Sequence, residues 1–239
     1  MTASPVVSDA TLDAERAVAA ERAVAERPGS LLRVAGGAAL VAGPVLFSLG
    51  MLTCPPQASM ADADYVASLA RDSTLTQVSA LLLHYANIAI GVGLLAAPSL
   101  VRGRRGRLAT SIGALLAVVG FVNVSGQILA DWWNMSTGRL LPLDQAAELF
   151  STVKASSLMP FWDATEPFSL LGPVLVFVGL ARAGVLGWWT LPVFVGGVVG
   201  LVLIPVQMTL LVAVVVLLGF SPLVFVGVRI IQRHRAGVV

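Results

Sequence analysis

Six long apolar stretches follow one another along this chain and leave it few ways to fold. They fall near residues 32–53, 77–100, 108–133, 167–184, 185–204 and 207–229. A helix of about 20 apolar residues crosses the hydrocarbon core of a bilayer, and in lipid only helices and closed barrels satisfy the backbone hydrogen bonds. We therefore expect an all-α, polytopic membrane helix bundle with about six transmembrane helices. The boundary between the last two spans is the least defined, because only Pro205-Val206-Gln207 interrupts residues 184–229.

The composition agrees with a chain that is solvated mainly by lipid. Hydrophobic residues make up 57% of the 239 residues and charged residues only 12%, whereas soluble domains carry roughly 25% charged residues. Residues 1–30 are polar, and they read as a cytoplasmic tail that is too long and too acidic to begin a signal peptide. We expect a single transmembrane domain over residues 31–232 and a short cytoplasmic tail over 233–239.

Basic residues predict the orientation of the bundle. With both termini inside, 12 basic residues lie in the cytoplasm and only Arg71, Arg139 and Lys154 lie outside. This asymmetry follows the positive-inside rule and places the chain in the cytoplasmic (inner) membrane of a bacterium as a multi-pass protein. The Arg-Gly-Arg-Arg-Gly-Arg run at 102–107 is interpreted as the topology determinant, not as a nucleic-acid patch, which would need more area and aromatic partners.

Residue counts and missing motifs exclude several kinds of active centre. Cys54 is the only cysteine, and His84 and His234 are the only histidines, so an intrachain disulfide and a cysteine-rich or poly-histidine metal site are excluded. The chain has no His-Glu-x-x-His, no Gly-x-Ser-x-Gly, no phosphate loop and no Asp-Asp-x-x-Asp motif. We expect neither a metal nor a cofactor, and no energy supply from ATP.

Two loops on the predicted outer side are longer than hairpins require. Each contains apolar residues at helical spacing, and these are Tyr65, Val66, Leu69 and Ala70 in the first loop and Leu143, Ala147, Phe150 and Val153 in the second. The pattern predicts two short amphipathic helices on the outer membrane surface. A simple interfacial position and a lid over a pocket both agree with it.

The span 108–133 carries a polar stripe. Asn123, Gln127 and Asp131 follow one another at i, i+4 and i+8, which places them on one helical face. Polar side chains inside a membrane usually face the protein interior or a wet cavity. Trp132 and Trp133 then mark the outer interface.

Polar residues of other spans are expected at the same depth. His84 and Asn87 share one face of the second span, and Trp162, Asp163 and Glu166 open the fourth. Gln207 lies at the turn before the last span, again on the outer side, whereas the inner half of the membrane has almost no polar residues. This distribution predicts a pocket open to the outer leaflet rather than a channel. The alternatives are that Asn87 and Asn123 are interhelical hydrogen-bonding residues, and that the carboxylates sit in headgroup water and tether the helix ends.

Carboxylates grouped in a partly dry pocket suggest acid–base chemistry, because such a site raises the pKa of one acid until it can donate a proton. The leading hypothesis is therefore a pocket that binds a lipophilic small molecule and acts on it as a cyclase or isomerase of a terpenoid-like substrate. Asp131 and Glu166 are the acid candidates, with Asp163 beside them and His84 as base or orienter. The proposed substrate-binding residues are Asn87, Asn123, Gln127, Trp132, Trp133, Trp162 and Gln207.

A small-solute or proton-coupled transporter and a non-catalytic membrane accessory protein are the alternatives. The expected partners are membrane lipid and a lipophilic ligand, with no nucleic acid and no oligomeric state specified.

The layout resembles a group of uncharacterised actinobacterial six-span integral membrane proteins. The residues that carry the resemblance are Leu31-Leu-Arg-Val-Ala-Gly-Gly, Cys54-Pro55, His84, the 102–107 arginine run and Trp188-Trp189. The resemblance covers about residues 30–235 and implies a fold without a function. In size and in its outer-side acids the chain is also similar to the small integral-membrane terpene cyclases. It departs from them at Asn87-Ile-Ala-Ile, where they have a Trp-Glu pair, and in span number, so no catalytic residue is carried over.

Overall fold

The computed structural model describes residues 28–236, and every regular element in that range is helical, which confirms the predicted all-α class there. The expectations for residues 1–27 and 237–239 lie outside the described residues. The elements are α2 (Pro28–Thr53), α3 (Asp62–Arg71), α4 (Ser73–Leu94), η1 (Ala97–Leu100), α5 (Arg107–Gln127), α6 (Leu129–Leu140), α7 (Leu143–Lys154), α8 (Met159–Asp163), α9 (Phe168–Arg182), α10 (Thr190–Leu203), α11 (Thr209–Gly219) and α12 (Ser221–Arg235).

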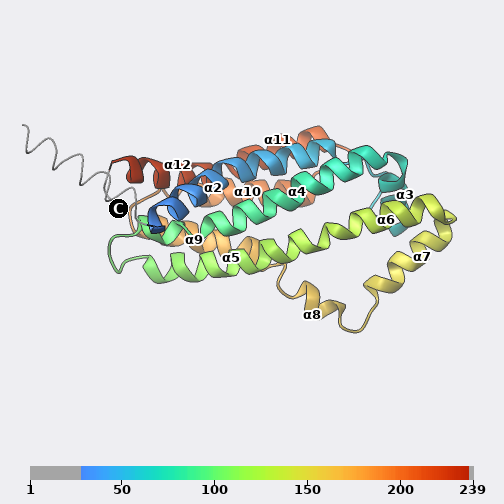
Figure 1. The fold of residues 1–239 in the computed structure, drawn as a ribbon, viewed down its shortest axis with the longest axis horizontal. Helices are drawn as coiled ribbons and strands as arrows, with labels where there is room; N and C mark the ends of the chain where they lie inside the picture. The colour runs from blue at the N-terminus through green and yellow to red at the C-terminus, as the bar shows by residue number, and fades with distance from the viewer. Residues whose placement is uncertain (1–27, 237–239) are drawn as a thin grey trace, which may run out of the picture.

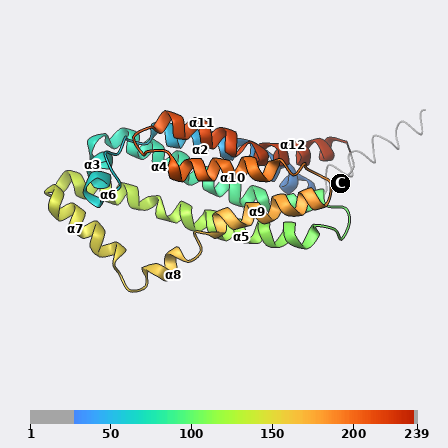
Figure 2. The same ribbon diagram turned by 180° about the vertical axis from the view of Figure 1, so that it is seen from behind.

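The helices form an elongated bundle (Figure 1). The two ends of the bundle differ in the charge of their residues. We call one end the arginine end: α2 begins there, α12 ends there, and the η1–α5 and α9–α10 turns lie there (left in Figure 1). We call α3, α6 and α7 at the opposite end the cap. Figure 2, the view from behind, shows α10 and α11 running along the bundle and α8 standing away from it between α7 and α9.

Four helical segments are long and apolar enough to cross a membrane: Leu31–Thr53, Ser73–Leu100, Arg107–Leu140 and Met159–Arg182. The pair α11 and α12, which meet at an angle of 40°, makes a fifth if it is counted as one span. The predicted span 185–204 contains α10, which has only 14 residues and is shorter than the roughly 20 needed to cross. The described part thus has four to five candidate spans, and the count of six stays a prediction.

The bend between α11 and α12 has a local cause. Pro222 follows directly after the first residue of α12 and lacks a backbone N–H, so the helix is interrupted at Phe220. The Phe220 ring is buried, with ring centroids 5.2 Å from Phe47 on α2 and 5.5 Å from Phe194 on α10. The bend therefore brings an aromatic side chain into the centre of the bundle.

Helices α5 and α9 pack with their backbones in contact. A Cβ atom on Gly172 of α9 would overlap the backbone of Ala117 on α5, and one on Gly120 of α5 would overlap the backbone of Ser169. Small residues permit this close approach in membrane helices. The contact fixes the start of α9, and with it the α8–α9 turn, beside the middle of α5.

The cap is a separate layer of short helices. Val66 and Leu69 of α3 and Ala146 of α7 are buried, and Lys154 of α7 lies 2.8 Å from Asp62 of α3. Helices thus occupy both loops in which the sequence predicts them. Their position at an outer membrane surface stays a prediction.

Candidate functional site

The central feature of the site is a cavity of about 500 Å³ where α9 meets α5 and α10. We call it the α9 cavity, and its lining residues are Phe47, Asn87, Phe121, Val124, Asp163, Glu166, Pro167, Ser169, Leu170, Val198, Leu201, Val202 and Phe220. Most of these side chains are apolar. The paired rings of Phe47 and Phe220 form part of its wall. The volume falls within the roughly 300–1,000 Å³ range of small-molecule pockets.

One residue of this lining is a buried asparagine with an unpaired acceptor atom. Asn87 on α4 is 1% exposed, and its Nδ2 donates a 2.7 Å hydrogen bond to the carbonyl oxygen of Leu83. Its Oδ1 is buried and has no hydrogen-bond partner among the described residues. A buried acceptor without a partner destabilises the fold by about 1–3 kcal/mol. A ligand that donates a hydrogen bond to Oδ1 would recover part of that energy.

Two carboxylates line the same cavity from the α8–α9 segment. Asp163 ends α8 and Glu166 lies in the turn before α9, and both are exposed. Gln127 Nε2 donates a 3.0 Å hydrogen bond to Asp163 Oδ1, and Asn123 Nδ2 donates a 3.1 Å bond to the carbonyl oxygen of Trp162. Two residues of the predicted stripe thus hold α8 against α5 and position Asp163 at the cavity.

His84 lines a different pocket, of about 240 Å³, which we call the His84 groove. The groove lies between α4 and the α5–α6 junction and is also lined by Tyr85, Ser125 and Trp132. Ser125 Oγ lies 2.8 Å from Nδ1 of His84. Val124 and Ser125 are neighbours on α5 but line different cavities, so α5 separates His84 from the two carboxylates.

Asp131 lies in neither cavity. Its backbone N–H donates to the carbonyl oxygen of Ile128, three residues back, so a tight turn joins α5 to α6. Such a turn has about 3.0 residues per turn instead of 3.6, and it rotates the following residues away from the stripe. The hydroxyl of Tyr65 on α3 donates a hydrogen bond to Asp131, and burial together with the charge of Asp131 raises the pKa of Tyr65. The structure therefore places Asp131 and Glu166 in different parts of the molecule.

The remaining predicted residues lie apart from one another. Gln207 donates a 2.5 Å hydrogen bond to the carbonyl oxygen of Ala58 and ties the α10–α11 turn to the α2–α3 loop. Trp133 on α6 is 69% exposed. Trp162 on α8 is exposed beside Gly126 of α5.

Sequence reasoning missed several residues of these sites. Ser125 lies only two positions from Asn123, so it falls off the stripe and its approach to His84 depends on the α4–α5 packing. Tyr65 fits the apolar side of a short helix, and nothing in the local pattern reveals its bond to Asp131. Ser169 and the phenylalanines of the α9 cavity come from separate helices. Only the tertiary arrangement brings them together.

No three His, Cys, Asp or Glu side chains within residues 28–236 come together in a way that would hold a metal ion. Comparison of the chain with models of known protein families, with curated proteins and with solved structures gives no match.

Proposed function

We propose that this chain is a multi-pass protein of the bacterial cytoplasmic membrane that binds a lipophilic small molecule in the α9 cavity. The arginine end faces the cytoplasm in this proposal and the cap faces outward, in accord with the charge asymmetry of the sequence. The candidate spans supply the apolar surface that such a location needs.

The observation that carries the proposal is the unpaired, buried Oδ1 of Asn87 in the lining of a mainly apolar cavity. Apolar walls favour a hydrocarbon ligand, and the unpaired Oδ1 of Asn87 favours a ligand with a hydrogen-bond donor. A lipophilic alcohol has both properties. Sites that hold their ligand mainly by apolar surface and orient it by a few polar groups are typical of small-molecule pockets.

Entry from the membrane fits the position of α10. Val202 lines the cavity and is 76% exposed, and its neighbour Leu203 is 74% exposed. Side chains of this kind would contact acyl chains when the bundle is in a bilayer. The ligand therefore reaches the cavity sideways from the outer leaflet, past α10.

Binding can be tested with farnesol, an isoprenoid alcohol, and its methyl ether, which has no hydroxyl donor. The full-length protein in detergent is titrated with each, and binding is followed by tryptophan fluorescence. The wild type is expected to prefer farnesol by about fivefold, the equivalent of one net hydrogen bond of about 1 kcal/mol. Asn87→Leu is expected to remove this preference while both compounds still bind. Absence of binding of both compounds to the wild type would contradict the proposal.

Acid–base catalysis in the same cavity is a second candidate function, favoured by Asp163 and Glu166 in its lining. A protonated carboxylic acid would add its proton to a carbon–carbon double bond of an isoprenoid ligand. The second carboxylate would remove a proton from the neighbouring carbon, which gives an isomerised or cyclised product without an external reactant. The rings of Phe47 and Phe220 could stabilise the intermediate cation.

This second candidate predicts that farnesol takes up deuterium at carbon when it is incubated with the protein in heavy water. Glu166→Gln and Asp163→Asn should each abolish the uptake and leave farnesol binding in place. Deuterium uptake that is equal in both variants and the wild type would remove these residues from the mechanism.

Transport is less well supported by the arrangement of the described residues. Towards the arginine end the buried core is mainly apolar, with Leu40, Leu94, Val176 and Leu180 among its side chains. A transported polar solute or proton would need a path lined by polar groups through this region. For a purely accessory protein, the wild type would bind neither farnesol nor its methyl ether in the titration above.

A further inference from the structure

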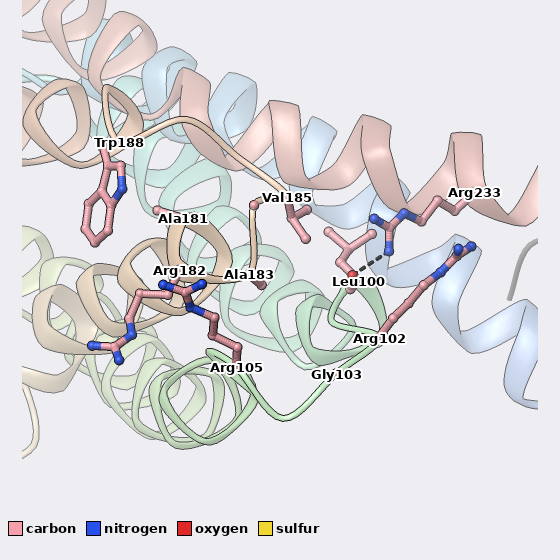
Figure 3. Close-up of a pocket in the computed structure, with 11 residues that line it drawn as sticks. Leu100, Arg102, Gly103, Arg105, Ala181, Arg182, Ala183, Val185, Trp188 and Arg233 are labelled. Atoms are coloured by element: carbon pink, nitrogen blue, oxygen red, sulfur yellow. Dashed lines mark hydrogen bonds between the residues drawn. The ribbon is translucent and has the colours of Figure 1, made fainter.

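A larger pocket, of about 790 Å³, lies at the arginine end of the bundle. We call it the arginine pocket. Arg102 and Arg105 come from the η1–α5 turn, Arg182 from the end of α9, and Arg233 from the last turns of α12. Figure 3 shows Arg105 and Arg182 in front of α9 on the same side as Trp188, and Arg102 and Arg233 on the other side of the pocket, beside Leu100.

Turns of defined geometry hold the pocket. Gly106 (φ 80°) and Gly184 (φ 69°) have left-handed backbone conformations, which favour glycine. A Cβ on Gly106 would overlap the carbonyl of Gly179 on α9, so the two turns are packed together. The Arg233 guanidinium donates a hydrogen bond to the carbonyl oxygen of Leu100, which joins α12 to the same wall (Figure 3).

The charge of this pocket is one-sided within the described part of the chain. The acidic residues of the described part of the chain all belong to the cap, to the α3–α4 junction or to the α8–α9 segment, and they are Asp62, Asp64, Asp72, Asp131, Asp144, Glu148, Asp163 and Glu166. None of them lines the arginine pocket. The Arg233 hydrogen bond goes to a neutral carbonyl, which orients the guanidinium without neutralising it. Arg105 and Arg182 are both exposed towards the opening.

The two helix ends at the pocket have opposite dipoles. The N-terminus of α5, which begins at Arg107, favours an anion, and the C-terminus of α9, which ends at Arg182, disfavours one. These partial charges oppose each other, so the full charges of the guanidinium groups determine the sign of the ligand. Arginine presents its donors in a planar fork that matches the oxygens of phosphate.

We propose that the arginine pocket binds the phosphate group of an anionic membrane phospholipid through Arg105 and Arg182. The side chains of Leu100 and Val185 give the pocket apolar walls for the glycerol and upper acyl carbons. Trp188 is 56% exposed beside them, and amphipathic indole rings are typical of the headgroup level of a membrane. The inference depends on the proposed membrane location and is independent of the ligand of the α9 cavity.

The orientation of the protein in the membrane does not by itself require that these arginines line one pocket. Positive-inside residues orient a membrane protein when they are merely present in short loops, and the run at 102–107 is sufficient for that. Arg182 and Arg233 belong to helices far away in sequence and still line the same pocket as Arg102 and Arg105. Arg104 and Arg107 belong to the run but do not line the pocket. They therefore provide a matched control.

The test compares two double variants of the full-length protein, R105Q/R182Q and R104Q/R107Q, which change net charge equally in the same region. Native mass spectrometry in neutral detergent measures the affinity for phosphatidylglycerol, phosphatidylcholine and inorganic phosphate. The wild type is expected to prefer phosphatidylglycerol to phosphatidylcholine. R105Q/R182Q should lose affinity for phosphatidylglycerol roughly thirtyfold, since a basic residue near an anionic membrane surface contributes about a factor of five, whereas R104Q/R107Q should change it by less than about threefold.

Equal losses in the two variants would overturn the proposal, because they would show general attraction and no site. Equal affinity of the wild type for the two lipids would overturn it as well. If inorganic phosphate displaces phosphatidylglycerol at equal phosphate concentration, the phosphate site is supported and its ligand is a soluble phosphate compound. R105K/R182K keeps the charge and is expected to keep the lipid preference, which separates a binding defect from a folding defect. Farnesol binding should be unchanged in all of these variants, so this inference and the proposed function can fail separately.

Discussion

Gln127 on α5 donates a 3.0 Å hydrogen bond to Asp163 on α8, and this bond joins the polar stripe to the carboxylates of the α9 cavity. Gln127 thus tethers α8, a short helix whose Phe161 and Trp162 side chains are largely exposed. Asn123 makes the second connection, to the carbonyl oxygen of Trp162. The position of Asp163 at the cavity thus depends on side chains of α5.

Replacing Gln127 by Leu is expected to loosen α8. The loss of one exposed hydrogen bond of about 1 kcal/mol should raise amide hydrogen exchange in residues 159–167 about fivefold. Gln77→Leu is the control, because the Gln77 side chain donates to the carbonyl oxygen of Ser73 in its own helix. Exchange in residues 159–167 that is unchanged in the Gln127 variant would show that α8 is held by other contacts.

Gly197 and Gly196 should respond oppositely to substitution by alanine. A Cβ on Gly197 of α10 would overlap Gly219 of α11, whereas nothing lies within 4 Å of a Cβ on Gly196. We expect Gly197→Ala to destabilise the bundle by about 1–3 kcal/mol through overpacking. Gly196→Ala should be neutral or stabilising by up to about 1 kcal/mol, since alanine favours the helix. Thermal unfolding in detergent measures both, and a larger loss for Gly196→Ala would contradict the packing of α10 on α11.

This pair also shows what the sequence could not predict. Gly196-x-x-x-Gly200 has the spacing of a close helix contact, but only the rotation of α10 decides which glycine faces the partner. That rotation depends on α11 and on the bend at Phe220, which local patterns do not contain. Gly197, one residue further on, makes the backbone contact with α11.

The contact of Asp62 with α7 predicts a dependence of stability on pH. Hydrogen bonds from Lys154 and Ser151 lower the pKa of Asp62 in the folded protein. Its stabilising effect is therefore complete above the unfolded pKa, near 3.9, and is lost as the pH falls through the lower folded pKa. The difference in Tm between the wild type and Asp62→Asn should be small, because the pair is at the surface. It should be constant near neutral pH and disappear in acid.

Lys154→Met removes the same contact from the other side and should reproduce this profile. A Tm difference that grows as the pH falls would contradict the assigned bond.

Cys54, the only cysteine of the chain, reports on the interior of the cap. Burial, and then the charge of Asp131, raises the pKa of its thiol. Because the thiolate is the reactive form, the rate of maleimide labelling should rise with a midpoint above the ordinary value of about 8.5. Asp131→Asn should lower this midpoint without restoring the ordinary value, because burial remains. Asp144→Asn on α7 serves as control, and a wild-type midpoint at or below 8.5 would contradict the packing around Cys54.

Hydropathy predicts most of the fold because the helices must satisfy their backbone inside lipid, and four predicted spans appear as long apolar helices. The predicted span 185–204 is longer than α10, which begins only at Thr190, because residues 183–189 form the turn that contains Gly184. The sequence also predicts the same depth in the membrane for Asn87, Asp163 and Glu166. In the structure these three residues line one cavity. The sequence could not separate Asp131 from them, because the tight turn at Ile128 carries no distinctive residue. His84 is separated for a different reason, namely the position of α5 between the two cavities.

The α9 cavity is tested most directly by filling it. Val198 lines the cavity, whereas its neighbour Val199 is 46% exposed and does not. Val198→Phe and Val199→Phe add the same volume to the same helix, and farnesol binding is measured for both by titration. We predict that Val198→Phe weakens farnesol binding at least about tenfold and that Val199→Phe leaves it within about twofold of the wild type. Equal affinities in the two variants would contradict binding in the α9 cavity.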